Sequence, residues 1–390
     1  MERLMKSVII YGTPAHGHIN PTLYLVEKLL KNNYKVIYYA LDEFKDKIIK
    51  SGAVYKKYEF NSNKIDLQDG SRILKFYRLL LEYTNELIDG LLEECEVYKP
   101  SLIIHDSVAT WGRHVAHINN IPSASFNSII TINSIFSKAS FLYSISFMRT
   151  FFLYMNEIYE IKKYKRILKQ KYKLKKLGMI DTIMNKENLN IMAFAREMQP
   201  GGEKFDDTYF FLGPSSIYRN EDYCDNFDID LKNIIYVSLG TIFNNDVEFF
   251  NILFSKLRNT RYTVVVSIGC NTIDIFDDIP DNFIVRNYVN QSNVLKNSVL
   301  FITAGGMNSI NEAIKYNVPC LVYPKQGEQN VNSLMLKKLK MGDIIKDINN
   351  IDKQIADIIN NYHMWDYTLA EKITKVNIED LIKKIDDYIK

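Results

Sequence analysis

Short runs of β-branched residues alternate with helical patterns along this chain, and the alternation appears once in each half. In the first half, strands are predicted at 8–11, 36–39 and 101–104. In the second half, strands are predicted at 234–237, 262–266, 283–285, 299–302 and 320–323. Strands that alternate with helices form parallel sheets with helices on both faces. The sequence therefore predicts an α/β protein with two doubly wound, Rossmann-like domains that face each other across a cleft.

The boundary between the two predicted domains lies near Gly213. Gly213-Pro214 and the polar, acidic stretch at 219–230 are typical of an interdomain linker. We expect an N-terminal domain at 1–212, a linker at 213–231, a C-terminal domain at 232–375 and a last helix within 376–390. Asp228 and Asp230 have a D-x-D spacing, but their place in the linker favours solvated side chains over a metal site.

Composition narrows the class of protein. The 390 residues carry 49 Lys+Arg against 46 Asp+Glu, so the chain lacks the basic excess that nucleic-acid binders show. The four cysteines form no C-x-x-C pair, which argues against a disulfide framework or a zinc site and favours a reducing compartment. The most apolar stretch, 140–155, is interrupted by Arg149 and falls short of a membrane span. We expect a cytoplasmic protein.

Two histidines occupy the segment after the first predicted strand. His16 and His18 lie beside glycines, and we expect the following helix to begin at Asn20 and Pro21, a favourable cap and a favourable first residue. A histidine at a strand-to-helix turn can act as a general base near neutral pH. Its alternative role is structural, as a helix cap or a partner of the backbone.

Asp106 follows the strand predicted at 101–104, at what would be the carboxyl end of the sheet. If that strand neighbours the first strand, Asp106 could reach His16 and hold its tautomer, as a carboxylate does for a catalytic base. The alternative is that Asp106 caps a helix. Both roles are compatible.

The segment 301–313 holds the most specific motif of the second half. A predicted buried strand ends at Thr303, two glycines allow a tight turn, and a helix begins near Asn308. Backbone amides at such a helix start favour phosphate. Glu312, one turn further on, could accept hydrogen bonds from sugar or ribose hydroxyls. The segment 324–329 follows another strand with an adjacent acid and amide, which suits a polyhydroxylated ligand.

Aromatic residues crowd 136–154, and the basic run 162–176 follows them with no acid inside it. One interpretation is a pair of amphipathic helices with a solvated basic face. Another is a hydrophobic acceptor pocket beside a basic helix that contacts an anionic membrane surface. The pocket residues that we single out are Phe126, Phe136, Phe141 and Phe147.

Taken together, the order and spacing of these motifs resemble the inverting, nucleotide-sugar-dependent glycosyltransferases of family 1, which have the GT-B fold. The resemblance spans nearly the whole chain and is greatest to the bacterial macrolide and flavonoid glycosyltransferases. It implies that His16 deprotonates the acceptor hydroxyl, that Asp106 orients His16, and that the last helix crosses back to the N-terminal domain. It implies no cofactor and no metal, with the donor a UDP-sugar of the UDP-glucose type.

The resemblance also implies roles for the residues of the second half. The donor site would comprise diphosphate ligands (Thr241, Gly305, Gly306, Asn308 and Ser309), base contacts (Tyr288, Val289 and Gln291), the ribose ligand Glu312, and the sugar ligands Glu328 and Gln329. Ala304 stands where the family has a histidine that contacts the diphosphate. Glu328 replaces the family's aspartate, and Asn290 its proline.

These implications predict transfer of a hexose to a hydroxyl of a hydrophobic or aromatic small molecule by a monomer or homodimer. The alternatives are a non-catalytic GT-B protein that binds nucleotide sugar or activates a partner, which Ala304 motivates, and a transferase that acts on a membrane lipid.

Overall fold

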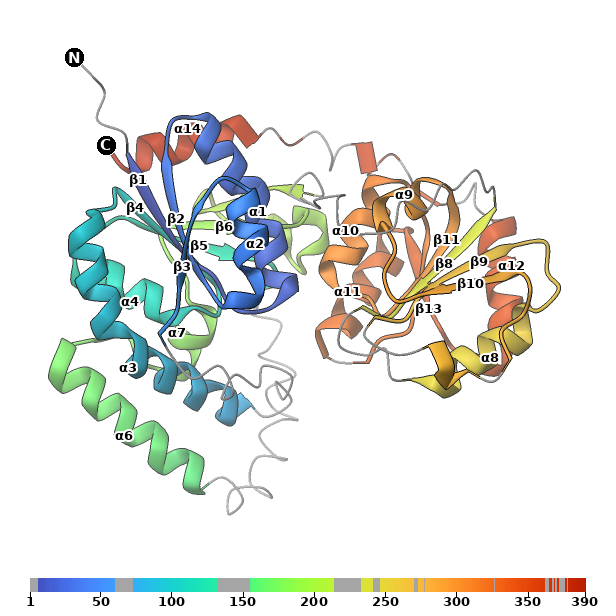
Figure 1. The fold of residues 1–390 in the computed structure, drawn as a ribbon, viewed down its shortest axis with the longest axis horizontal. Helices are drawn as coiled ribbons and strands as arrows, with labels where there is room; N and C mark the ends of the chain where they lie inside the picture. Colours follow the sequence, from blue (N-terminus) through green and yellow to red (C-terminus); the bar gives the residue numbers. More distant parts are fainter. Residues whose placement is uncertain are drawn as a thin grey trace. The chain divides into compact units, whose positions relative to one another are not determined.

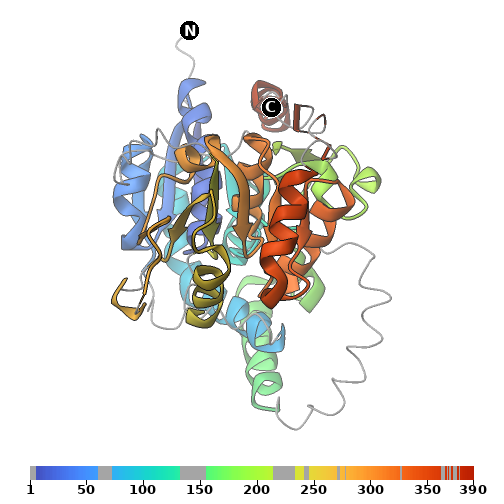
Figure 2. The ribbon, with the colours of Figure 1, turned by 90° about the vertical axis from the view of Figure 1, so that its right-hand side faces the viewer.

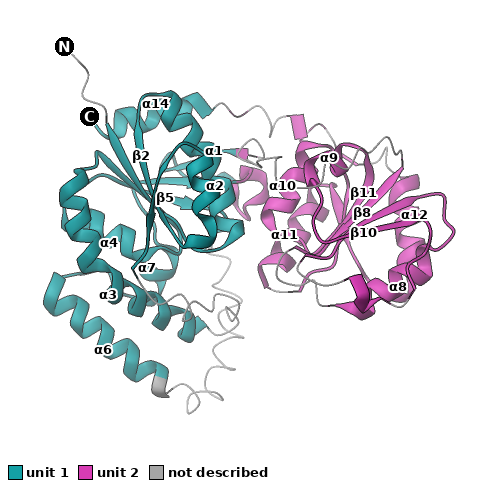
Figure 3. Ribbon diagram, in the orientation of Figure 1, with its two compact units in different colours: residues 1–193, 203–212, 377–390 teal, residues 194–202, 213–376 magenta. Residues whose placement is uncertain are grey.

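The chain folds into two compact units, each built around its own parallel sheet (Figure 1). The structure, a computed structural model, describes residues 6–59, 73–131, 155–213, 233–240, 246–269, 273–276, 278–325, 327–361, 365–366, 368, 370–371, 376 and 378–390. Unit 1 comprises Met1–Ala193, Glu203–Leu212 and Asn377–Lys390, and unit 2 comprises Phe194–Gly202 and Gly213–Val376 (Figure 3). The prediction of two doubly wound, parallel-sheet α/β halves is confirmed.

Unit 1 has a seven-stranded sheet in the order β3-β2-β1-β4-β5-β6-β7. Its strands are β1 (Ser7–Tyr11), β2 (Lys35–Ala40), β3 (Val54–Lys57), β4 (Leu102–Asp106), β5 (Ser123–Asn127), β6 (Leu189–Met192) and β7 (Tyr209–Phe211). Its helices are α1 (His16–Lys31), α2 (Lys45–Lys50), α3 (Ile73–Tyr98), α4 (Thr110–Ile118), α6 (Met155–Tyr172), α7 (Met179–Met184) and α14 (Ile378–Tyr388). Strands β1, β4 and β5 are almost wholly buried because helices cover both faces of the sheet.

The central strand β1 pairs in parallel with β2 on one side and with β4 on the other. The register aligns Tyr11 with His105, the residue before Asp106. Parallel strands that are neighbours in a sheet have their carboxyl ends at the same edge, so the loop after β1 lies beside the end of β4. This confirms that β4 is the neighbour of the first strand.

Helix α1 begins at His16, five residues before the predicted first residue Pro21. Its N-cap residue is Ala15, and Pro21 lies within the helix. The prediction that Asn20 caps the helix is therefore wrong; its side-chain oxygen instead accepts a hydrogen bond from Lys47 Nζ at 2.9 Å. A proline near the start of a helix costs one backbone hydrogen bond, and the early turns tolerate this loss best. The earlier start places both histidines on the first turn.

Two helices cover unit 1 from distant parts of the sequence. Figures 1 and 2 show α6 alongside α3, where Arg78 Nε donates to Glu157 Oε2 at 2.5 Å. The C-terminal helix α14 belongs to unit 1: Asp386 pairs with Lys6 at 3.1 Å, and Tyr388 donates to the main-chain oxygen of Ser123 at 3.2 Å.

Unit 2 has a six-stranded sheet in the order β10-β9-β8-β11-β12-β13. Its strands are β8 (Ile234–Ser238), β9 (Thr263–Ser267), β10 (Phe283–Arg286), β11 (Ser298–Thr303), β12 (Cys320–Val322) and β13 (Gly342–Ile344). Its helices are α8 (Val247–Leu257), α9 (Gln291–Lys296), α10 (Met307–Lys315), α11 (Gly327–Lys338) and α12 (Ile351–Asn360). Strands β8 and β12 flank β11, so three loops gather where these strands end.

A buried histidine makes the stability of unit 1 sensitive to acid. His114 in α4 is 4% exposed, and burial, assisted by the neighbouring Arg113, lowers its pKa from 6.5 to about 3. In the unfolded chain this histidine takes up a proton below about pH 6.5, whereas the folded chain holds it neutral. Protonation of His114 therefore favours the unfolded chain below about pH 6.5, and the free energy of unfolding falls as the pH falls.

We expect the free energy of unfolding of unit 1 to fall by about 2 kcal/mol between pH 7 and pH 5 through His114 alone. Urea unfolding at a series of pH values measures this loss. His114→Gln removes the titrating group, so its unfolding free energy should vary less with pH over the same window. An identical pH dependence in the variant and the wild type would contradict the assignment.

Candidate active site

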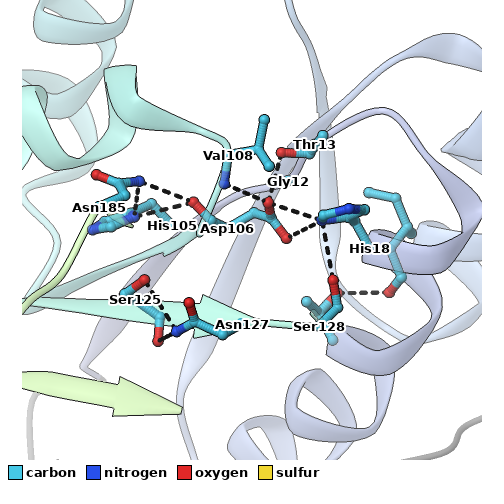
Figure 4. A network of polar contacts seen from close by, with 12 residues as sticks. Gly12, Thr13, His18, His105, Asp106, Val108, Ser125, Asn127, Ser128 and Asn185 are labelled. Carbon is cyan, nitrogen blue, oxygen red and sulfur yellow. Dashed lines mark hydrogen bonds and ion pairs between the residues drawn. The ribbon is translucent and has the colours of Figure 1, made fainter. Parts of the chain in front are cut away.

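The carboxylate of Asp106 is the centre of a polar network at the end of β4 (Figure 4). It is 1% exposed, and its Oδ1 accepts hydrogen bonds from Thr13 Oγ1 and from the main-chain nitrogen of Val108, both at 2.8 Å. His18 Nδ1 lies 3.0 Å from Oδ1 and 2.9 Å from Oδ2. The network thus joins the loop after β1, the first turn of α1 and the end of β4.

The contact with Asp106 defines which nitrogen of His18 can do chemistry. An ionised carboxylate can only accept, so Nδ1 carries the proton and donates it to Asp106. The lone pair is then on Nε2, which is the arrangement of a general base whose tautomer a carboxylate holds. Ser128 Oγ lies 3.1 Å from the same Nδ1, and the His18 side chain is 15% exposed. The imidazole is both oriented and accessible.

The structure places His18 on Asp106, in the position that the sequence analysis assigned to His16. The reason is the early start of α1: residues two apart on an α-helix point about 200° from each other, so the two rings face nearly opposite ways. His16 is exposed, and its ring meets the edge of Phe44 at a centroid distance of 5.0 Å. The expected pairing of His16 with Asp106 is corrected accordingly.

A second cluster of polar residues surrounds His105 and the main chain of Asp106. His105 is fully buried, with Nε2 3.3 Å from Glu187 Oε1, and Asn185 Nδ2 donates to the main-chain oxygen of Asp106 at 3.2 Å. Burial alone would raise the pKa of Glu187, but hydrogen bonds from His105 and His117 outweigh it and lower this pKa. The end of β4 is therefore held rigidly.

In unit 2, the turn between β11 and α10 is where the sequence predicts phosphate binding. Gly305 has φ +87°, and a Cβ there would lie 2.7 Å from Val322 Cγ1, so this turn requires glycine. Gly306 is the N-cap residue of α10 and, as a glycine, has no side chain to cap the helix. Asn308 and Ser309 lie on the first turn of this helix, whose amides favour an anion.

Two predicted nucleoside ligands of unit 2 lie in contact. Gln291 Nε2 donates to Glu312 Oε2 at 3.0 Å, and Gln291 Oε1 accepts from Tyr236 at 3.2 Å. Both side chains are buried, with Glu312 1% exposed. Gln291 therefore holds the Glu312 carboxylate on α10, one turn after the glycine turn.

Similarity to known proteins shows which family this chain belongs to. The sequence profile described as "UDP-glucoronosyl and UDP-glucosyl transferase" matches residues 229–361. NDP-glycosyltransferase YjiC of Bacillus subtilis is 33% identical over 86% of this chain and 83% of its own length. The chain belongs to glycosyltransferase family 1. Oleandomycin glycosyltransferase of Streptomyces antibioticus is 23% identical over 85% of this chain and 77% of its own length.

The fold of this glycosyltransferase is GT-B. The crystal structure of the calicheamicin glycosyltransferase CalG4 superposes with a TM-score of 0.80, covering 99% of each chain at 18% identity. The family match and the relatives identify a UDP-dependent glycosyltransferase, as the sequence predicts. Among the described helices, none is long and apolar enough to cross a bilayer.

The remaining residues that were predicted to bind the donor differ in how deeply they are buried. Tyr288 is 50% exposed, while Val289 and Ala304 are buried. Gln329 Oε1 accepts from the main-chain nitrogen of Lys325 at 2.7 Å, and Glu328 Oε1 lies 3.4 Å from Asn332 Nδ2. These residues follow β10, β11 and β12, at one edge of the sheet. Thr241 lies outside the described residues.

The acceptor-side predictions are mostly beyond what the structure describes. Phe136, Phe141 and Phe147 lie outside the described residues, as does most of the linker. Phe126 is fully buried in β5. In the basic run, Lys163 pairs with Glu160, and Lys171 pairs with Asp89. The membrane contact stays a prediction.

The sequence did not predict the contact of His18 with Asp106 or the ion pair of Lys325 with Asp246. What selects His18 is the start of α1 at His16, because the residue two positions on then faces the opposite side, and the sequence favoured a later start. Lys325 forms an ion pair with Asp246, which only the alignment of β8 and β12 on either side of β11 brings together.

Proposed function

We propose that this protein transfers a hexose, with inversion, from a UDP-sugar of the UDP-glucose type to a hydroxyl of a hydrophobic or aromatic small molecule. The observation that carries the proposal is the contact between His18 Nδ1 and Asp106 Oδ2 at 2.9 Å. It leaves Nε2 as the base. The aromatic sequence at 136–154 and the similarity to oleandomycin glycosyltransferase support a hydrophobic acceptor.

The chemistry is a single displacement. His18 Nε2 takes the proton of the acceptor hydroxyl while the acceptor oxygen attacks the anomeric carbon of the sugar. The bond from that carbon to the diphosphate oxygen breaks, and its electron pair leaves with UDP. Asp106 stabilises the imidazolium that forms. Attack opposite the leaving group inverts the anomeric centre.

The start of α10 supplies the stabilisation of the leaving diphosphate. Its amides, around Gly306, Asn308 and Ser309, carry the positive end of the helix dipole, which favours the charge that develops on UDP. We propose that transfer needs no added metal. Activity that is unchanged in the presence of a chelator supports this proposal, and activity that returns only with a divalent cation contradicts it.

A donor and acceptor screen tests the proposed function. The pure protein is incubated with UDP-glucose and a panel of phenols and macrolides, and UDP release and glycoside formation are followed by mass spectrometry. We expect at least one glycoside. If neither transfer nor donor hydrolysis occurs with any common nucleotide sugar, and calorimetry shows no binding of UDP, a non-catalytic role replaces this proposal.

A further inference from the structure

An ion pair lies at the edge of the unit 2 sheet where β11 leads into α10. Asp246 is the N-cap residue of α8, which follows β8, and Lys325 follows β12. Their side chains form an ion pair, with Lys325 21% and Asp246 26% exposed. Because β8 and β12 are the two neighbours of β11, this ion pair spans the carboxyl end of the strand between them.

The ammonium group of Lys325 lies over the ring of Tyr323, the residue after β12. It lies 3.5 Å from the centroid of the Tyr323 ring, which stacks on Phe249 at 4.6 Å. The main-chain nitrogen of Tyr323 donates to Thr303 O at 2.8 Å, which makes Tyr323 and Ala304 neighbours across the two strands. Ala304 packs in the same cluster of side chains as this ring.

The segment from β11 to the start of α10 contains no cation of its own that could bind a diphosphate. No lysine or arginine occurs from 297 to 314, and Glu312 adds a buried carboxylate. The carboxylate of Asp246 adds another negative charge, which would repel a diphosphate. Lys325 pairs with Asp246 and is a cation that the fold brings to this edge from another loop.

We propose that Lys325 binds the diphosphate of the nucleotide sugar and exchanges Asp246 for a phosphate oxygen when the donor arrives. This inference rests on the proposed function, which places the diphosphate at the start of α10. Asp246 is then the partner of the ammonium group only while no donor is bound, so its carboxylate competes with the phosphate for Lys325. The same ammonium stabilises the charge that develops on UDP as the sugar leaves.

Three variants separate a donor ligand from a purely structural ion pair. Lys325→Met removes the cation. Asp246→Asn releases the ammonium but keeps the cap of α8, because asparagine also accepts from the main-chain nitrogen of Phe249. Lys337→Met is the matched control, since Lys337 is on α11 and pairs with Asp343 at 2.7 Å. Binding of UDP and UDP-glucose to each full-length variant is measured by calorimetry at two salt concentrations, and melting temperatures check folding.

We expect Lys325→Met to weaken UDP binding by about 10- to 100-fold, the loss of one charge-assisted hydrogen bond, and to flatten the salt dependence. Asp246→Asn and Lys337→Met should bind UDP at least as well as the wild type. Equal losses in Lys325→Met and Asp246→Asn would show a structural ion pair and overturn the inference, as would wild-type affinity in Lys325→Met. A wild type that binds no UDP would instead overturn the proposed function itself.

Discussion

Replacing His18 by alanine should lower kcat for glycoside formation by about 10²- to 10⁴-fold, the contribution of a positioned general base. The expected loss follows from the geometry: His18 is the imidazole whose Nδ1 lies 2.9 Å from Asp106, so its Nε2 is the nitrogen with a lone pair. Initial rates with UDP-glucose and the best acceptor of the screen measure this loss. UDP affinity should be unchanged, because His18 belongs to unit 1 and the proposed donor ligands belong to unit 2.

His16→Ala is the matched control for this experiment. The two histidines share one helical turn, but His16 is exposed and its ring contacts Phe44. A surface substitution of this kind changes the free energy of unfolding by about 0.5 kcal/mol or less, so the variant should fold. Because His18 and not His16 contacts Asp106, kcat should stay close to that of the wild type. A large loss in His16→Ala with near-normal turnover in His18→Ala would restore the role that the sequence motif suggested for His16.

Asp106→Asn should lower kcat by about 10²- to 10⁴-fold, close to the effect of losing the base itself. Asparagine can still accept from Thr13 and Val108, which now donate to Oδ1 at 2.8 Å, so the loop geometry should survive. What it loses is the negative charge that stabilises the His18 imidazolium and selects its tautomer. Steady-state rates with saturating donor and acceptor measure the effect.

Thr13→Val controls for the network around Asp106. It removes one hydrogen bond to the carboxylate but leaves the charge and the His18 contact, so we expect a loss of about 10-fold or less.

The double variant His18→Ala/Asp106→Asn tests whether the two residues act together. Its loss of kcat should be much smaller than the product of the losses in the two single variants, because the pair acts as one unit. Fully additive losses would show that Asp106 acts without His18.

The architecture could be predicted because it depends on local patterns. Buried parallel strands read as continuous β-branched runs such as Val8–Tyr11, and each helix between them has one apolar face. The turn at Gly305 was predicted from two adjacent glycines after a buried strand, and the positive φ of Gly305 agrees with it. These features depend on neighbouring residues, so a single sequence is enough to find them.

The choice between His16 and His18 failed on a helix boundary. Pro21 is a favourable first helical residue, and that preference moved the predicted start to Asn20. In the structure the helix starts at His16, and its rotation then selects His18 for Asp106. The first residue of a helix is decided by small differences in free energy. Local sequence preferences therefore could not distinguish His16 from His18, although the choice decides which imidazole contacts Asp106.

The ion pair of Lys325 and Asp246 could not be predicted for a different reason. These residues are 79 positions apart and approach each other only because β8 and β12 flank β11. Strand order is a property of the whole sheet, and no local pattern records it. The seating of α14 in unit 1 through Asp386 depends on tertiary packing in the same way.

The anomeric configuration of the product tests the central claim most directly. UDP-glucose carries an α-linked sugar, and one displacement by a hydroxyl that His18 activates must give a β-glucoside. Proton NMR of the purified product, through the coupling constant of its anomeric proton, distinguishes the two outcomes. We predict the β-glucoside from the wild type and its loss in His18→Ala. An α-glucoside, or a β-glucoside formed equally fast by His18→Ala, would contradict the account.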